Sequence, residues 1–227
     1  MTYIWQDFNI KTFPAETIVF RDGVFCPEIS TLETTVVDKN YDLPVHYIYV
    51  GELTGDNVLN IEIKDTVKKQ PVFISVRVNV KNNADLKIVI KNSSMDSVIR
   101  GFIVLENHGN LKFIIDAYHL SRNTGILLKT RLVAYKNSVS NLSGAAHIYQ
   151  YCDNCDSDID FSAMADTDAK IVFKPVQRIS AVPESASHSA NIFNANPAQI
   201  EYLHESGLTD DAVQNVMCEA FVNNTDF

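Results

Sequence analysis

The chain has 227 residues, and its 28 acidic and 19 basic side chains give a formal net charge of −9 at pH 7. This balance argues against a nucleic-acid scaffold and against binding to an anionic membrane, because both need a net or clustered positive surface. A chain of this length buries roughly 70% of its unfolded surface, so it needs no disulfide or metal staple to fold.

The sequence gives no sign of export. The N-terminus has no basic segment followed by an apolar run, and no stretch approaches the ~18 uninterrupted apolar residues that span a membrane. The four cysteines, Cys26, Cys152, Cys155 and Cys218, are too few and too unevenly spaced for a secreted disulfide framework. We therefore expect a reducing, cytoplasmic compartment.

Residues 17–193 contain one short apolar segment after another. The segments are rich in Val, Ile, Phe and Tyr, often alternate with polar residues, and are separated by Asn, Asp and Gly, as strands and their turns are. No helical periodicity of convincing length interrupts them. The region is predicted to be all-β, with strands at 17–20, 46–50, 58–63, 72–80, 86–90, 102–105, 111–115, 126–133 and 171–173.

A weak internal repeat favours a solenoid among the all-β folds. Residues 83–90 resemble residues 108–115, which follow 25 residues later, and a looser copy at 167–173 lies 58 residues beyond that. Units of ~20–30 residues that each contain a short set of strands are typical of a solenoid, in which each coil buries its face against its neighbours. A sandwich or a barrel can produce the same similarity by chance.

The pattern changes near residue 194, so we predict a β-helix core with a short lead-in at 1–193 and a helical tail at 194–227. Asn196 and Pro197 are a good N-cap and first helical residue, and Gly207 is a C-terminal stop. Thr209 caps a second helix with two aspartates in its first turn. The apolar face of this second helix is predicted to comprise Val213, Val216, Met217, Ala220 and Phe221.

Cys152 and Cys155 form a C-x-x-C pair, the shortest spacing at which two thiolates reach one metal ion. No second pair completes a structural zinc site, and the β-rich context is not that of a thioredoxin. The pair is either two unrelated thiols in an acidic loop or strand, or a site of transient iron or cluster binding. The neighbouring aspartates do not match a calcium-binding EF-hand loop, so a solvated acidic turn is the better interpretation.

The rest of the sequence contains little that suggests chemistry. The histidines before residue 150 are His46, His108, His119 and His147. They are scattered beside strands and turns, where a histidine is usually a surface or hydrogen-bonded residue. Cys26 and Cys218 are expected to be small apolar fillers. No nucleophile elbow, phosphate-binding loop, dinucleotide-binding loop or H-E-x-x-H motif occurs, so we expect no catalytic activity.

The segment from Lys174 to Phe221 contains a recognisable frame. Its parts are Lys174-Pro-Val-Gln-Arg-Ile, Ser187-His-Ser, Glu201-Tyr-Leu-His-Glu-Ser-Gly-Leu and Cys218-Glu-Ala-Phe. This ungapped pattern resembles the core domain of the SufB/SufD family, the scaffold proteins of the SUF system of iron–sulfur cluster assembly. The resemblance implies a right-handed parallel β-helix followed by C-terminal helices, in agreement with the repeat and the tail.

The resemblance also implies a role for His188, because the matching histidine of SufD is implicated in cluster assembly at the SufB–SufD interface. SufB-type members have a Cys two residues earlier, where this chain has Ala186, so the chain is more similar to SufD. Neutral imidazole is a competent iron ligand. The alternative is a histidine that fixes the sheet-to-helix corner by hydrogen bonding. We take His188 first, and Cys152 and Cys155 second, as candidate ligands of a transient iron–sulfur cluster.

Partners follow from the same resemblance. The family's C-terminal helices resemble a docking surface for SufC, the ABC-type ATPase, and the solenoid pairs with a SufB-like chain or a second copy through β-helix edges. The candidate docking residues are Tyr202, Leu203, Glu205, Gly207, Leu208 and Phe221. The alternative for their apolar members is that they cover the open end of the solenoid.

Three functional hypotheses result. The first is a non-catalytic, SufD-like assembly subunit that binds no nucleotide itself. The second is a carbohydrate-active enzyme on a β-helix, although the sequence shows no register of aromatic and acidic residues on successive coils. The third is an interaction or architectural solenoid without cluster chemistry, which the missing thiol at Ala186 makes credible.

Overall fold

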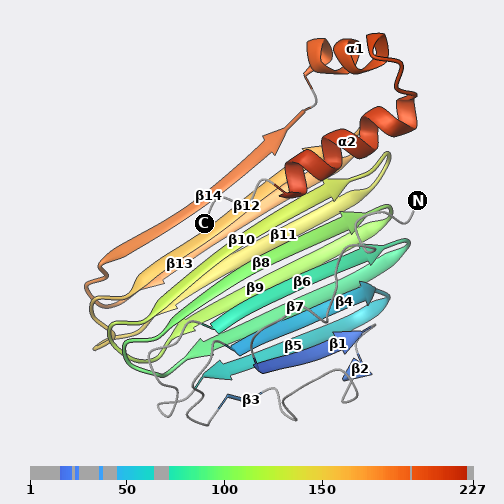
Figure 1. The fold of residues 1–227 in the computed structure, drawn as a ribbon. Coiled ribbons are helices and arrows are strands. Elements are labelled where there is room, and N and C mark those ends of the chain that lie inside the picture. The colour runs from blue at the N-terminus through green and yellow to red at the C-terminus, as the bar shows by residue number, and fades with distance from the viewer. Residues whose placement is uncertain are drawn as a thin grey trace.

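The computed structural model describes residues 16–21, 24–25, 36–37, 45–63, 72–194 and 196–223. Its strands form two facing sheets, and the chain passes from one sheet to the other at each half turn (Figure 1). All pairings are parallel except one short antiparallel pair near the N-terminal end of the described chain. The result is a β-solenoid of about five turns with two C-terminal helices, as the sequence predicted.

One sheet has eight strands, β1 (Glu16–Arg21), β2 (Val24–Phe25), β4 (Val45–Glu52), β6 (Val72–Val80), β8 (Val98–Asn107), β10 (Gly125–Ala134), β12 (Asp156–Ala165) and β14 (Ser185–Phe193). The other has six, β3 (Val36–Val37), β5 (Gly55–Ile63), β7 (Asn83–Asn92), β9 (Asn110–His119), β11 (Val139–Ile148) and β13 (Lys170–Ile179). The first sheet runs β14-β12-β10-β8-β6-β4-β1-β2 and the second β13-β11-β9-β7-β5-β3. Two helices follow, α1 (Pro197–Glu205) and α2 (Asp210–Asn223).

Alternating side chains build the core between the sheets. In β6 every second residue is buried, from Val72 to Val80, because successive side chains of a strand point to opposite faces. Each fully buried Val, Ile or Leu contributes roughly 1.5–3 kcal/mol. Phe161 continues the core toward the C-terminal coil, where its ring stacks on Phe173 with centroids 5.6 Å apart.

The register of the coils corrects the repeat seen in the sequence. Leu86 pairs with Phe113, 27 residues on, and not with Leu111 as the 25-residue spacing suggested. Later coils are longer, since Val139 pairs with Lys170. The misalignment of two residues kept every side chain on its proper face, because the side-chain period of a strand is two.

The corners use the turn residues that the sequence indicated. Asp96, Asn123 and Asn154 adopt positive φ angles of 56–61°, a conformation that Asn and Asp tolerate better than most residues. The Asn123 amide donates to the Asp96 carboxylate at 3.0 Å across adjacent coils. Side-chain hydrogen bonds of this kind hold successive turns in line.

The helical tail begins and turns where the sequence predicted. The Asn196 side chain accepts a hydrogen bond from the Ala198 N–H at 3.0 Å, and Gly207 follows α1 with a φ of 88°. The helix α2 lies on the outer face of the eight-stranded sheet (Figure 1) and so does not cover the end of the solenoid. In the part of the chain that the structure describes, no helix is long and apolar enough to cross a membrane.

The buried face of α2 differs from the predicted one. Val213, Cys218 and Val222 are buried, whereas Val216 is 42% exposed and Ala220 is also exposed. The helix is therefore rotated relative to the expected stripe, because Cys218 and Val222 pack on the sheet. The expected role of Cys218 as an apolar filler is confirmed, while Cys26 lies outside the described residues.

Candidate functional site

The last coil, made of β13 and β14, leaves the interior of the solenoid open. Inward-facing positions of earlier coils are buried, but their counterparts here are not: Ile179 is 40% exposed and Ile192 is 51% exposed. Ile179 pairs with the buried Ile148, and Ile192 pairs with the buried Ala163, so both point inward. Among the described residues no further strand pairs with β13 or β14 on the free side. The end of the core is thus a neutral, largely apolar surface.

His188 lies in the middle of β14 on this open surface. It pairs with Ile159, which is buried in the core, so the imidazole stands on the inward side of the strand. The side chain is exposed, because within the described residues no further coil pairs with β14 on its free side. It accepts and donates no hydrogen bond within the described ranges. The alternative interpretation, a corner histidine held by hydrogen bonding, does not fit this position within a strand.

The two thiols of the C-x-x-C pair lie in the turn between β11 and β12. Both are buried, and the Cys155 sulfur is 3.1 Å from the Cys152 carbonyl oxygen and 3.3 Å from the Ser121 carbonyl oxygen. These contacts suit a thiol that donates. Burial, followed by the neighbouring Cys155, raises the pKa of the Cys152 thiol. Both thiols therefore resemble structural cysteines more than exposed, reactive thiolates.

Ala186 links the thiols to His188. Its side chain packs against the cluster of Ile148, Cys152 and Cys155. Alternate residues of a strand are about 7 Å apart on the same face. The His188 imidazole is therefore the next side chain after Ala186 on the inward face of β14. The structure thus brings all three candidate ligands to one region of the open end. In the described ranges, however, no three His, Cys, Asp or Glu side chains are grouped closely enough to hold a metal ion.

A buried polar chain beside the thiols was missed by sequence reasoning. His119 Nδ1 is 2.8 Å from the Thr124 hydroxyl, which in turn is 3.2 Å from the Cys155 sulfur. Burial lowers the pKa of His119 to about 4, so this imidazole is neutral at pH 7. The chain ties two neighbouring turns together beneath the open end. No short-range signal in the sequence distinguishes His119 from the exposed histidines.

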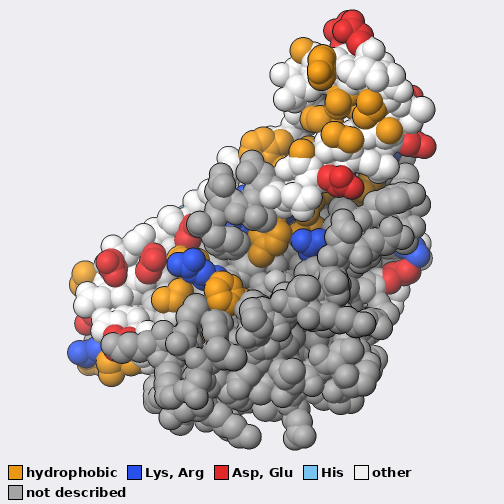
Figure 2. All heavy atoms as spheres, viewed as in Figure 1, with side chains coloured by type: hydrophobic (Ala, Val, Ile, Leu, Met, Phe, Trp, Pro, Cys, Tyr) orange, Lys and Arg blue, Asp and Glu red, His pale blue; other side chains and the backbone are white. Residues whose placement is uncertain are grey.

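The predicted docking residues separate into two groups. Tyr202, Leu203, Glu205, Gly207 and Leu208 lie on α1 and the loop after it, and Tyr202 is 68% exposed. Hydrophobic side chains gather over this helical tail (Figure 2).

Phe221 does not belong to that exposed group. Its ring is 5.8 Å from that of Phe193, and the Arg131 guanidinium lies 5.9 Å from the Phe221 centroid. Arg131 is itself paired with Asp160 at 2.8 Å. Phe221 therefore anchors α2 to the sheet, and the surface available to a partner centres on α1.

Comparison with known proteins adds nothing to this geometry. No protein-family model matches the sequence, and no curated protein matches it either. The resemblance of the segment from Lys174 to Phe221 therefore stays a prediction, and so does every function that it implies.

Proposed function

We propose that this chain is a non-catalytic scaffold subunit of iron–sulfur cluster assembly. It pairs with a SufB-like chain or a second copy of itself through the open end and docks a SufC-type ABC ATPase on the helical tail. The observation that carries this proposal is His188, an exposed imidazole on the inward side of an uncovered coil. A ligand placed there is available to a second chain and to little else.

The open end suits a partner solenoid. The inward-facing side chains of β14 are Ala186, His188, Ala190 and Ile192. They are small or apolar apart from the imidazole, so another coil can approach closely. An edge strand also offers unpaired backbone groups that a second chain can pair with. Pairing there removes the exposed inward face of Ile192 from water and brings His188 into an interface.

The ligand arrangement suits a cargo held between chains. Iron–sulfur clusters are usually held by four ligands, chiefly thiolates, and the described residues supply one exposed imidazole at this end. The remaining ligands would come from the partner. Cys152 and Cys155 lie behind Ala186 and join only if their turn opens, since both are buried and the Cys155 thiol donates to backbone oxygens. His188 is thus the first ligand and the thiols are the second.

The helical tail suits a docking role. Leu203 and Leu208 are half-exposed and Tyr202 is exposed, next to the acidic Glu205. An amphipathic helix with such an edge is a common partner surface. The tail binds the ATPase while the solenoid presents the cargo site, so neither role requires this chain to bind nucleotide.

The test is reconstitution of the complex. The chain is co-expressed with a SufC-type ATPase, and the purified complex is supplied with ferrous iron and sulfide without oxygen. We expect the cluster absorbance to fall severalfold in His188→Ala. The matched control is Asn191→Ala, on the same exposed strand but the outward face, which retains the absorbance. Equal cluster content in both variants refutes the ligand role, and failure to co-purify refutes the partner.

One observation favours a second candidate, an architectural solenoid without cluster chemistry. The position of the SufB-type cysteine is Ala186, and the nearby thiols are buried. This alternative predicts the same complex with the ATPase. It also predicts that the wild-type complex binds no more iron than the complex of the His188→Ala variant. Metal analysis of the purified complex separates the two.

A further inference from the structure

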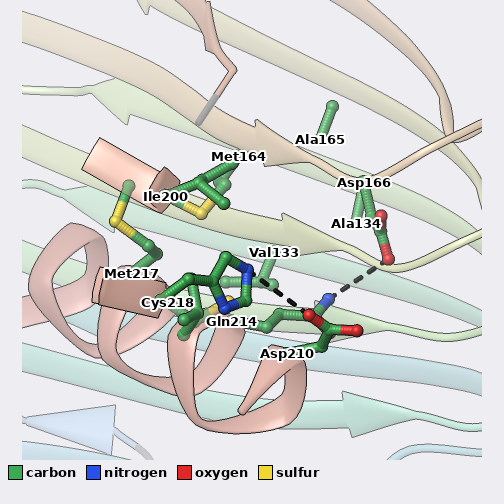
Figure 3. A pocket seen from close by; sticks show the side chains of 12 residues that line it. Val133, Ala134, Met164, Ala165, Asp166, Ile200, Asp210, Gln214, Met217 and Cys218 are labelled. Atoms are coloured by element: carbon green, nitrogen blue, oxygen red, sulfur yellow. Dashed lines mark hydrogen bonds and ion pairs between the residues drawn. The ribbon is translucent and has the colours of Figure 1, made fainter. Parts of the chain in front are cut away.

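A cavity of about 250 Å³ lies between the helical tail and the outer face of the eight-stranded sheet (Figure 3). Val133 and Met164 line it from strands β10 and β12, Val213 and Met217 from α2, and Ile200 from α1. For comparison, an engineered apolar cavity of about 150 Å³ binds benzene. The docking residues Tyr202, Leu203 and Glu205 do not line it, whereas Ile200 and His204 of the same helix do, so the cavity adjoins the docking surface without using its candidate residues.

The helices do not fill this space. The helix α1 buries none of its residues, and Ile200 is only half-buried where it faces the cavity. Apolar side chains at the cavity therefore remain in contact with water, and covering them is favourable. Two methionines contribute to the wall, and methionine side chains adapt readily to the shape of a ligand.

Carboxylates stand at the edge of the cavity. Asp166 follows β12 and accepts a hydrogen bond from the Gln214 amide at 3.1 Å, and Asp210 lies in the first turn of α2. His204 Nε2 is 3.3 Å from Asp210 (Figure 3). No Lys or Arg is among the lining residues. The edge thus attracts a cation and repels an anion.

We propose that this cavity binds a small aliphatic amine, with its alkyl chain against Met164, Met217 and Val213 and its ammonium group at Asp166. The apolar walls account for the alkyl chain and the two carboxylates account for the charge. The proposal does not depend on the iron–sulfur role, because none of its residues belongs to the open end.

The test uses three probes of equal chain length: hexylammonium, hexanol and hexanoate. Each is titrated into the full chain by calorimetry. We expect saturable binding of hexylammonium, three- to tenfold tighter than hexanol, as one or two exposed ion pairs allow. Hexanoate binds most weakly, and added salt weakens only the ammonium ligand. Absence of saturable hexylammonium binding, or equal binding of hexanoate, overturns the proposal.

Two aspartates in one turn give a matched pair of variants. Asp166→Asn keeps the oxygen that accepts from the Thr167 N–H, loses the second oxygen that accepts from Gln214 and removes the charge, so hexylammonium affinity falls to that of hexanol. Asp168→Asn is the control, since Asp168 is exposed, does not line the cavity and has a φ of 60° that Asn tolerates. An equal effect of both substitutions overturns the site.

Filling the cavity tests the location independently of charge. Met164→Trp adds volume on the outward face of β12, where this side chain lines the cavity, so all three probes lose affinity together while circular dichroism confirms the fold. If this variant does not fold, the comparison of Asp166→Asn with Asp168→Asn still decides. Hydrogen exchange adds a second readout, with slower exchange of α1 amides expected when hexylammonium is bound.

Discussion

At the scale of single residues, Glu106 is the side chain whose ionisation we expect to affect stability most. It is 6% exposed on the outer face of β8, and one of its carboxylate oxygens has no hydrogen-bond partner among the described residues. Burial raises its pKa to about 7, although the charge of Arg77 acts in the opposite direction. Its charge also contributes to the raised pKa of Cys218, so it lies close to α2.

The folded chain therefore holds a proton on Glu106 at pH values where the unfolded chain has released it. This contribution to the free energy of unfolding is fully present below about pH 4.5 and is lost as the pH rises, and the loss reaches about 3 kcal/mol at pH 7. His119 has a lowered pKa and acts oppositely below pH 6.5. For that reason the effect is best measured as a difference between two proteins.

We predict that Glu106→Gln becomes more stable relative to wild type as the pH rises from 4.5 to 7. Denaturant unfolding at several pH values gives the two free energies of unfolding, and their difference changes by about 3 kcal/mol. The control is Glu201→Gln, on the exposed side of α1. Its free energy of unfolding is expected to differ from that of wild type by the same amount at every pH. A flat difference for Glu106→Gln would mean that the carboxyl group is already ionised at low pH.

At the scale of elements, the strands that the sequence predicted are those with long apolar side chains. Besides the two-residue strands β2 and β3, the three long strands β11, β12 and β14 were missed, because they are built mainly from Ser, Ala, Asn and Asp. Their small residues have a structural reason. A Cβ atom at Gly144 would come within 2.8 Å of the Phe161 ring. Strand β11 therefore has its smallest residue where β12 places a large aromatic side chain. Such complementarity depends on a register that a single sequence does not display.

The candidate site was predictable only in part for the same reason. The sequence identified His188 and the C-x-x-C pair separately. Their common location depends on Ala186 in β14, a strand that propensity alone does not predict. The buried chain from His119 to Cys155 depends on contacts across 36 residues. Local sequence patterns therefore identify the candidate ligands, whereas the residues that surround them are determined by how the coils stack.

The rotation of α2 leads to the second prediction. Val222 is 1% exposed on the sheet, whereas Val216, which the sequence placed on the apolar face, is 42% exposed. Val222→Asp buries an unpaired charge, so we expect α2 to detach and to become sensitive to proteolysis, with a loss of more than about 3 kcal/mol in its protection from hydrogen exchange. Val216→Asp changes protection by about 0.5 kcal/mol or less. Equal sensitivity of the two variants would contradict this rotation, and greater sensitivity of Val216→Asp would support the face predicted from the sequence.

At the scale of the whole molecule, the solenoid combines a strongly acidic chain with an uncharged end. The net charge is −9 at pH 7, but the inward-facing residues of β13 and β14 include no acidic or basic side chain other than His188. Two chains that meet end to end therefore gain apolar burial at the contact and are opposed by repulsion between their bodies. Because salt screens that repulsion, pairing is expected to strengthen with ionic strength.

This reasoning leads to a test of end-to-end pairing by light scattering after size exclusion. We predict that Ala190→Lys places a charge on the inward side of β14 and weakens self-association at least tenfold, as charged side chains on edge strands do. Asn191→Lys adds the same charge on the outward face of the same exposed strand and leaves association unchanged. Raising the salt from about 0.05 to 0.5 M strengthens association of wild type, because the repulsion of two acidic chains is then screened. If the two lysine substitutions weaken association equally, the contact does not lie at the open end. If the wild-type chain stays monomeric at all salt concentrations, self-pairing is excluded, and only a different solenoid is left as the partner.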